Sequence, residues 1–104
     1  MRAMARRYIL VKIVCDRRVT NEEFHEALIN STKRYFGELG LSRIDPRIVK
    51  FDAESSTAIV SCEQPATSEL ESAVALTTRY AETPMSLLVL RVSGTVKGAA
   101  RRWK

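Results

Sequence analysis

The sequence predicts one α+β domain in which a four-stranded antiparallel sheet carries two helices on one face. Runs of β-branched and apolar residues alternate with two amphipathic helical patterns, in the order strand, helix, strand, strand, helix, strand. The chain has 104 residues, and 45% of them are hydrophobic, which suits one buried core rather than two domains or a disordered chain. We therefore expect residues 1–104 to form a single domain.

The first strand is expected over residues 7–15, where β-branched and apolar side chains dominate. Because side chains alternate between the two faces of a strand, one face receives Ile9, Val11, Ile13 and Cys15. The opposite face receives Tyr8, Leu10, Lys12 and Val14. Both faces are largely apolar, so a terminal helix or a partner protein must cover the second one. Tyr8, Leu10 and Val14 are thus candidate partner-binding residues.

The first helix is expected over residues 21–39. Thr20 and Glu23 have the spacing of a capping box, in which the hydroxyl and the carboxylate satisfy each other's backbone N–H groups. Apolar residues then recur at three- and four-residue steps, and Gly40 is suited to a left-handed C-terminal cap. A hairpin follows, with strands over residues 47–51 and 57–62 and a polar turn between them.

The second helix is expected to begin near Pro65 and a Ser68–Glu71 capping box, and to end by about residue 82. Pro84 prevents its continuation because proline lacks the N–H that a helix needs. The fourth strand spans residues 85–92, and Ser93-Gly94 interrupts it. Thr95 is positioned to cap a short basic helix at the C-terminus.

The resulting order, βαββαβ, is that of ferredoxin-like domains and RNA-recognition motifs. Right-handed crossovers place both helices on one face and the strands in the order 4-1-3-2. The start of the first strand then lies beside the end of the fourth, so basic residues of both termini converge there. These residues are Arg2, Arg6, Arg7, Lys97, Arg101, Arg102 and Lys104.

Cys15 and Cys62 are expected to be free thiols. In this topology they lie at opposite ends of two antiparallel strands, roughly 16 Å apart at ~3.3 Å per residue. A disulfide requires Cα atoms within about 7 Å of each other. No stretch is long enough to span a membrane, and no signal-peptide cleavage site follows the basic N-terminus. We therefore expect a cytoplasmic protein.

The net charge of +5 and the pI near 9.6 favour a polyanionic partner. An RNA-recognition motif would stack bases on aromatic residues of its third strand, but residues 56–63 contain none. The converging basic termini are therefore the candidate nucleic-acid surface, contacting phosphates rather than bases. The competing interpretation is a solvated pair of termini. Trp103 among these cations would stack on a nucleotide or pack into a partner.

The sequence contains no recognisable catalytic or metal-binding constellation. His25 is the only histidine and lies on the first helix. Asp16, Asp45, Asp52 and Glu54 fall at strand ends or turns, where acids usually serve turns, although two close together can hold Mg²⁺. We expect no catalytic residue, no bound cofactor and no metal ligand in the chain.

Three segments resemble the Pop5/Rpp14 family of ribonuclease P proteins. They are residues 7–13, residues 48–52 with 57–62, and above all residues 90–97, Leu-Arg-Val-Ser-Gly-Thr-Val-Lys. The similarity runs over nearly the whole chain in the right order. It is most specific at Val-Ser-Gly-Thr-Val-Lys, and the short chain is more similar to archaeal forms than to eukaryotic ones.

The resemblance implies a subunit of the ribonucleoprotein that removes 5′ leaders from precursor tRNA, in which the RNA performs the chemistry with Mg²⁺. The family member pairs with an Rpp30-like, TIM-barrel partner and assists the catalytic domain of the RNA. Ser93, Gly94, Thr95 and Lys97 match the family's terminal motif and are expected to contact RNA. The topology adds Arg6, Arg7, Arg101 and Arg102, and the partner-binding candidates include Trp103.

Three alternatives stay open at this level. The first is a ferredoxin-like interaction or regulatory module that forms a homodimer and has no RNA function. The second is a stand-alone nuclease or an acylphosphatase-like enzyme, for which Asp16-Arg17-Arg18 offers only a faint match. The third concerns only the segment Ser93-Gly94-Thr95, which would be an ordinary strand-to-helix cap that forms with or without RNA.

Overall fold

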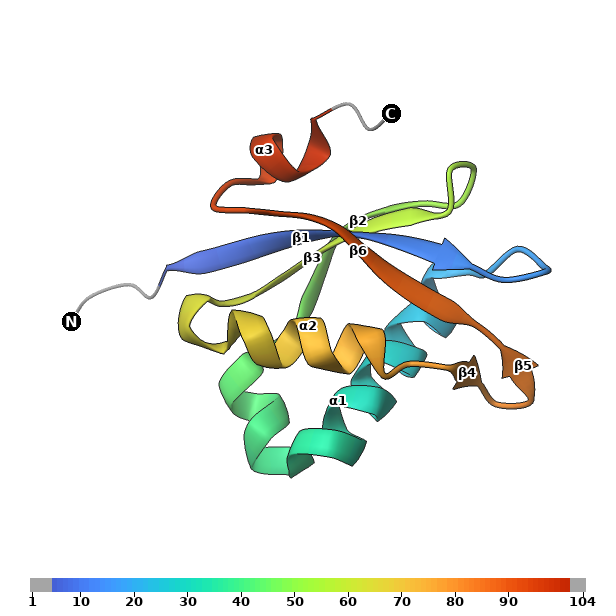
Figure 1. Cartoon of the computed structure of the whole chain (residues 1–104), viewed down its shortest axis with the longest axis horizontal. Helices are drawn as coiled ribbons and strands as arrows, with labels where there is room; N and C mark the ends of the chain where they lie inside the picture. Colours follow the sequence, from blue (N-terminus) through green and yellow to red (C-terminus); the bar gives the residue numbers. More distant parts are fainter. Residues whose placement is uncertain (1–4, 102–104) are drawn as a thin grey trace.

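The computed structural model describes residues 5–101, and its elements follow the expected order with a 3-10 turn and a short hairpin added. They are β1 (Arg6–Val14), α1 (Asn21–Ile44), β2 (Arg47–Asp52), β3 (Thr57–Glu63), η1 (Gln64–Ala66), α2 (Thr67–Ala75), β4 (Arg79–Tyr80), β5 (Thr83–Pro84), β6 (Ser86–Ser93) and α3 (Val96–Ala100). The predicted α+β class is confirmed (Figure 1). Within this range no helix has the length and apolar character needed to cross a membrane.

The sheet has the strand order β2-β3-β1-β6, which is the predicted order 4-1-3-2 read from its other edge. β1 pairs antiparallel with β3, where Tyr8 faces Ser61, and with β6, where Tyr8 faces Ser93. α1 and α2 lie on one face of the sheet and α3 lies on the other, as Figure 1 shows. We call these the helix face and the outer face.

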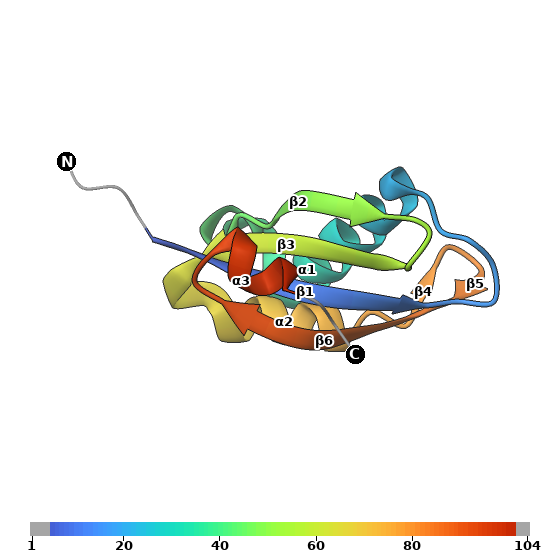
Figure 2. The same cartoon turned by 90° about the horizontal axis from the view of Figure 1, so that it is seen from above.

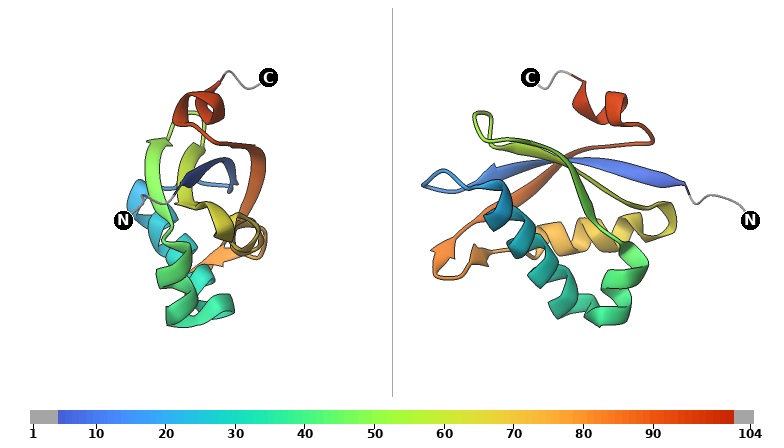
Figure 3. Two further views of the ribbon diagram at one scale, coloured as in Figure 1. Left: turned by 90° about the vertical axis from the view of Figure 1, so that its left-hand side faces the viewer. Right: turned by 180° about the vertical axis from the view of Figure 1, so that it is seen from behind.

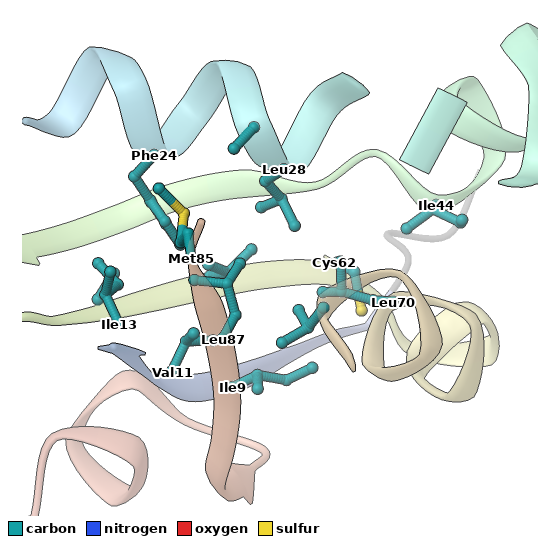
Figure 4. Close-up of a cluster of buried hydrophobic side chains, with 14 of the residues drawn as sticks. Ile9, Val11, Ile13, Phe24, Leu28, Ile44, Cys62, Leu70, Met85 and Leu87 are labelled. Atoms are coloured by element: carbon teal, nitrogen blue, oxygen red, sulfur yellow. The ribbon is translucent and has the colours of Figure 1, made fainter. Parts of the chain in front are cut away.

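The main core fills the space between the sheet and the two long helices (Figure 4). β1 contributes the face predicted for it, and every other major element adds large apolar side chains. Its members include Ile9, Val11, Ile13, Phe24, Leu28, Ile44, Val60, Cys62, Leu70, Val74 and Leu87. Each such side chain stabilises the fold by about 1.5–3 kcal/mol through removal from water, so this layer dominates stability.

α1 is longer than predicted, and the expected cap at Gly40 is wrong. The Thr20–Glu23 capping box is confirmed, with both reciprocal hydrogen bonds present. The positive-φ glycine is instead Gly37 (φ 75°), where the helix kinks before continuing to Ile44. Asp45, at φ 51°, provides the left-handed cap and donates its N–H to the Leu41 carbonyl. A Cβ added to Gly40 would lie 2.5 Å from Cβ of Phe36, so close packing, not a turn, requires glycine there.

α2 is shorter than predicted, and the Ser68–Glu71 box does not form. Its N-cap is Ala66, which makes no side-chain capping bond, and Pro65 lies in the preceding 3-10 turn. The helix stops at Ala75, and the hydroxyl of Thr77 donates to the Ala73 carbonyl at 2.7 Å. Because threonine hydroxyls compete for backbone partners in this way, they favour helix ends. The chain then forms the β4–β5 hairpin, not the extra helical turns expected up to residue 82.

Both cysteines are free thiols. Cys62 pairs with Arg7 at the start of β1, whereas Cys15 follows the end of that strand, so they lie far apart as expected. Burial raises the pKa of the Cys62 thiol, which keeps it neutral as part of the core.

Candidate nucleic-acid interface

The start of β1 lies beside the end of β6, as the predicted topology requires. Tyr8 pairs with Ser93, and a Cβ added to Gly94 would lie 3.1 Å from Nη1 of Arg7. The guanidinium of Arg7 therefore lies directly beside the turn from β6 to α3. We call the surface formed by Arg7, Ser93, Gly94, Thr95, Lys97 and Arg101 the basic corner.

The turn in this corner is a tight strand-to-helix cap. The Ser93 hydroxyl accepts from the Thr95 N–H at 3.2 Å, and the Thr95 hydroxyl accepts from the Gly98 N–H at 2.9 Å. A Cβ on Gly98 would lie 2.2 Å from Oγ of Ser93, so only glycine fits against it. The cap interpretation of Ser-Gly-Thr is thus confirmed as a structural role, and it fixes the direction in which α3 leaves the sheet.

Arg91 holds the other end of α3. Its guanidinium donates to the carbonyls of Gly98, Ala99 and Arg101 at 3.3, 3.4 and 2.5 Å. These carbonyls belong to the last turn, where a helix carries partial negative charge, so a cation stabilises it. Arg91 therefore anchors α3 to the sheet.

A β-bulge places Arg91 on the outer face. Leu10 pairs with Arg91 but Val11 pairs with Val89, so Leu90 is the extra residue. Strict alternation from Leu87 and Val89 would have turned residue 91 towards the helix-face core. Sequence reasoning missed this residue, and the only available signal was an arginine at a core-facing position of an apolar strand.

Lys97 and Arg101 are exposed, and Arg7 is half-buried. Among residues 5–101, no carboxylate lies within ion-pair distance of these three cations. Their charges are therefore available to an anionic partner. Arg2, Arg102, Trp103 and Lys104, which were also expected here, lie outside the described residues.

Arg6 is placed differently from Arg7, although the two were predicted to act together. Its guanidinium is only 17% exposed and forms ion pairs with Asp45 and Glu63 at 3.0 and 3.1 Å. It also donates to the Asp45 carbonyl and the Ser61 hydroxyl. Arg6 thus links β1, β3 and the end of α1, and its charge is already matched within the protein.

The outer face is only partly covered. Leu10, Ile59 and Ala99 form a small buried cluster under α3, with Tyr8 and Leu90 packed beside it. Leu10 is 7% exposed, whereas Val14 is 47% exposed at the far end of β1. Leu88, which sequence reasoning did not select, is 49% exposed on the neighbouring strand. Figure 2 shows α3 over one half of the sheet; among residues 5–101, no helix lies over the half where β1 ends and β6 begins.

The acids at strand ends serve structural roles. Asp52 accepts the N–H groups of Glu54 and Ser55 in the β2–β3 turn, and its hydrogen bonds with Ser55 lower its pKa. Asp45 pairs with both Arg6 and Arg47. Within residues 5–101, no cluster of three or more His, Cys, Asp or Glu side chains is placed to hold a metal ion.

The fold and this corner together define a small ferredoxin-like protein with a cationic surface built around a capped C-terminal helix. Residues 7–104 match the model of the Rpp14/Pop5 family, and the chain belongs to that family.

Relatives and solved structures agree with this assignment. "Ribonuclease P protein component 2" of Pyrococcus furiosus is 30% identical over 98 residues, covering 94% of this chain and 82% of the relative. The protein of the same name from Aeropyrum pernix is 33% identical over 82 residues, covering 79% of this chain and 67% of the relative. A chain of yeast ribonuclease MRP has the same fold, with a TM-score of 0.74 and 14% sequence identity. The match covers 91% of this chain and 78% of the yeast chain.

Proposed function

We propose that this chain is a non-catalytic protein subunit of ribonuclease P that assists RNA-catalysed removal of the 5′ leader from precursor tRNA. The observation that carries the proposal is the family match over residues 7–104, together with archaeal relatives named as ribonuclease P components. On this proposal the partner RNA uses Mg²⁺ for the reaction, and the protein binds no cofactor of its own. The chain would contact precursor tRNA only within the assembled complex. We place this complex in the cytoplasm, where free thiols such as those of the two cysteines persist.

The basic corner is the surface proposed to contact the catalytic domain of the RNA. Lys97 and Arg101 project from a helix whose two ends are both fixed, so their positions are set before binding. Arg7 supplies a third cation beside Gly94: its Nη1 lies next to the place of the missing side chain, so a phosphate that approaches this backbone also meets the guanidinium. Phosphate contacts of this kind position a protein on RNA without reading its sequence. Arg102 extends the same proposal beyond the described residues.

Arg6 has a supporting role in this proposal. Its guanidinium is matched by Asp45 and Glu63, so it orients the first residues of β1 rather than contacting phosphate. Because Arg6 holds the start of β1 in place, the neighbouring Arg7 is positioned beside the turn from β6 to α3.

The uncovered half of the outer face is proposed to receive the Rpp30-like partner. Val14 and Leu88 are both close to half exposed there, beside Lys12 on the same face. Exposed apolar side chains on neighbouring strands are typical of a protein contact. Tyr8 and Leu10 lie beneath α3 and support the contact indirectly. A homodimer through the same surface is the competing occupant, and light scattering with and without the partner separates the two.

The proposal is tested by precursor-tRNA cleavage at low Mg²⁺ with the cognate RNA, with and without this chain and its Rpp30-like partner. A corner variant, Lys97→Gln/Arg101→Gln, is compared with a control variant, Arg18→Gln/Lys33→Gln, which removes the same charge from exposed sites elsewhere. We expect the protein pair to raise cleavage. The corner variant should bind RNA about tenfold or more weakly, increasingly so at higher salt, while the control changes little.

Two results would contradict the proposal. If the wild-type pair does not change cleavage by the cognate RNA, the chain is better described as a ferredoxin-like interaction module. If the control variant is weakened as much as the corner variant, net charge matters and the basic corner is not a specific contact surface.

A further inference from the structure

A hollow of about 250 Å³ lies on the helix face of the molecule, between α1 and the segment that leads from α2 into the β4–β5 hairpin. Figure 3 shows this hairpin beside α1, on the opposite side of the sheet from α3. Two arginines from different elements line the hollow, Arg34 of α1 and Arg79 of β4. Asn30, Tyr35, Thr78 and Tyr80 also line it. We call it the α1–hairpin hollow.

The two arginines of the hollow differ from three arginines at the ends of α1. Arg17, Arg43 and Arg47 each form an ion pair with a carboxylate. Within residues 5–101, neither Arg34 nor Arg79 has a carboxylate at ion-pair distance. Glu26, whose carboxylate reaches this rim, accepts the hydroxyl of Tyr80 at 2.7 Å. The hollow therefore presents two arginines without an ion-pair partner in the described part of the chain, with one carboxylate, that of Glu26, at its rim.

The floor of the hollow is rigid and polar. The hydroxyls of Ser31 and Thr77 are buried, and both donate to the Ala73 carbonyl, at 2.9 and 2.7 Å. This shared acceptor ties α1, α2 and the following loop together. Ala81, which also lines the hollow, has a left-handed backbone (φ 53°) in the hairpin turn. These contacts join the elements that form the hollow.

An aromatic ring also lines the hollow, and one of the two cations lies over one face of it, which leaves the other face for a ligand. Tyr35 is 47% exposed, and the guanidinium carbon of Arg34 lies 6.0 Å from its ring centroid. An exposed ring next to a guanidinium suits a ligand that combines a flat base with a phosphate.

The size of the hollow indicates the kind of ligand. Sites that enclose free small molecules usually occupy about 300–1,000 Å³. At about 250 Å³ and open to solvent, this hollow lies just below that range, so it can receive part of a nucleotide, such as its phosphate, while the rest of a longer chain lies outside it.

We propose that the α1–hairpin hollow binds one nucleotide of a single-stranded RNA segment, with the phosphate between Arg34 and Arg79 and the base stacked on Tyr35. This inference rests on the proposed ribonuclease P function and adds a second RNA contact, on the far side of the sheet from the basic corner. The protein would then touch two separate RNA segments.

The test measures binding of the chain, assembled with its Rpp30-like partner, to labelled cognate RNA at several salt concentrations. The hollow variant, Arg34→Gln/Arg79→Gln, is compared with the corner variant and with the Arg18→Gln/Lys33→Gln control. Removing one cation that neutralises a phosphate of a single strand reduces the slope of log K against log[salt] by about 0.7, so the hollow variant should reduce it by about 1.4. The control should leave the slope nearly unchanged.

A second pair of variants tests the stacking interaction. Tyr35→Leu should weaken binding about tenfold with no change of salt slope, whereas Tyr35→Phe should bind as wild type because its ring still stacks. Thermal unfolding within about 2 °C of wild type shows that each variant is folded.

The outcomes separate the two proposals. If the hollow variant keeps the wild-type slope while the corner variant reduces it, the second RNA contact is refuted and the ribonuclease P proposal stands. If wild type does not bind the RNA, both fail. If the hollow variant keeps its RNA affinity but no longer sediments with the protein partner, the occupant is an acidic protein segment, and the RNA assignment of the hollow is wrong.

Discussion

The two faces of the sheet are built from the same strands but differ in how completely they are covered. On the helix face, side chains from six elements form one continuous core in which Phe24, Leu70 and Val60 are fully buried. On the outer face of the described residues, the buried apolar cluster is small: it consists of Leu10, Ile59 and Ala99, the last from a helix of five residues. Val14 and Leu88 remain about half exposed beside them.

This difference separates stability from recognition. Most of the buried apolar side chains lie on the helix face, so we expect the fold to depend more on this face than on α3. The outer face can therefore carry cations and exposed apolar side chains at little cost to folding. It follows that substitutions on the helix face should change stability, whereas substitutions on the outer face should change binding.

The largest expected effect comes from truncating a leucine on the helix face. Leu70→Ala should lower the free energy of unfolding by about 2–5 kcal/mol, because it removes a fully buried side chain and leaves a cavity. Leu88→Ala, the same change on the outer face, should cost less than about 1 kcal/mol but weaken partner binding. Urea unfolding gives the first quantity and sedimentation with the partner gives the second. If both variants lower the free energy of unfolding equally, the helix face does not contribute more to stability than the outer face, and the assigned roles are wrong.

The next effect separates two adjacent arginines. Arg6→Gln should destabilise the fold by about 2 kcal/mol, since it leaves Glu63 without an ion-pair partner among residues 5–101 and Asp45 with only the more exposed Arg47. Arg7→Gln should leave the melting temperature almost unchanged and reduce RNA affinity. Thermal melts and RNA binding on both variants check this pair. A melting temperature that falls more for Arg7→Gln than for Arg6→Gln would reverse the assigned roles.

A smaller effect is expected at the anchor of α3. Gly98→Ala should cost about 1 kcal/mol, because the new Cβ meets Oγ of Ser93 at 2.2 Å and must displace the helix. Hydrogen exchange of the 96–101 amides should then accelerate while that of the helix-face core stays slow. Ser93→Ala in the same chain should relieve the collision and restore part of the protection. Gly94→Ala is the control, since only the movable end of Arg7 is near it.

The smallest effect concerns the N-terminal cap of α1. The hydrogen bond from Arg17, followed by that from the Thr20 N–H, holds the pKa of Glu23 below its usual value of 4.5. A carboxyl group whose pKa is lower in the folded protein than in the unfolded chain stabilises the fold at pH values above its unfolded-state pKa. This stabilisation disappears as the pH falls through its folded-state pKa. Glu23→Gln should therefore reduce the urea midpoint at pH 7 but hardly at pH 3. Glu22→Gln serves as the control, and an equal reduction at both pH values would exclude the ionic origin.

Local patterns predicted most of the fold correctly. The Thr20–Glu23 box and the strands of the sheet depend on neighbouring residues, so they were visible in the sequence. The ends of both helices were not. Gly40 has the composition of a cap, but whether a glycine turns the chain or admits a close neighbour depends on Phe36 packing against it. Similarly, the spacing of Thr77 from the apolar residues before it had indicated the apolar side of a longer helix. In the structure its hydroxyl instead donates to the Ala73 carbonyl where α2 ends.

The candidate site was located by topology but not resolved into roles. Antiparallel pairing of the first and last strands was enough to bring Arg7 to the turn at Gly94. Arg6 was assigned the same role because the sequence does not show that Asp45, from the end of α1, arrives beside it. Arg91 was missed because a single bulge reverses the alternation that the strand pattern assumes.

The sequence by itself determined the order of elements, the helix face of β1, the cap of α1 and the positive charge at the chain ends. These properties depend on backbone preference, periodicity and composition, which act over a few neighbouring residues. Only the tertiary structure decided which cations are matched by carboxylates, how far α3 covers the sheet, and that Arg34 and Arg79 meet at one hollow. Those outcomes depend on contacts between residues far apart in the chain, and such contacts exist only once the sheet and helices have packed together.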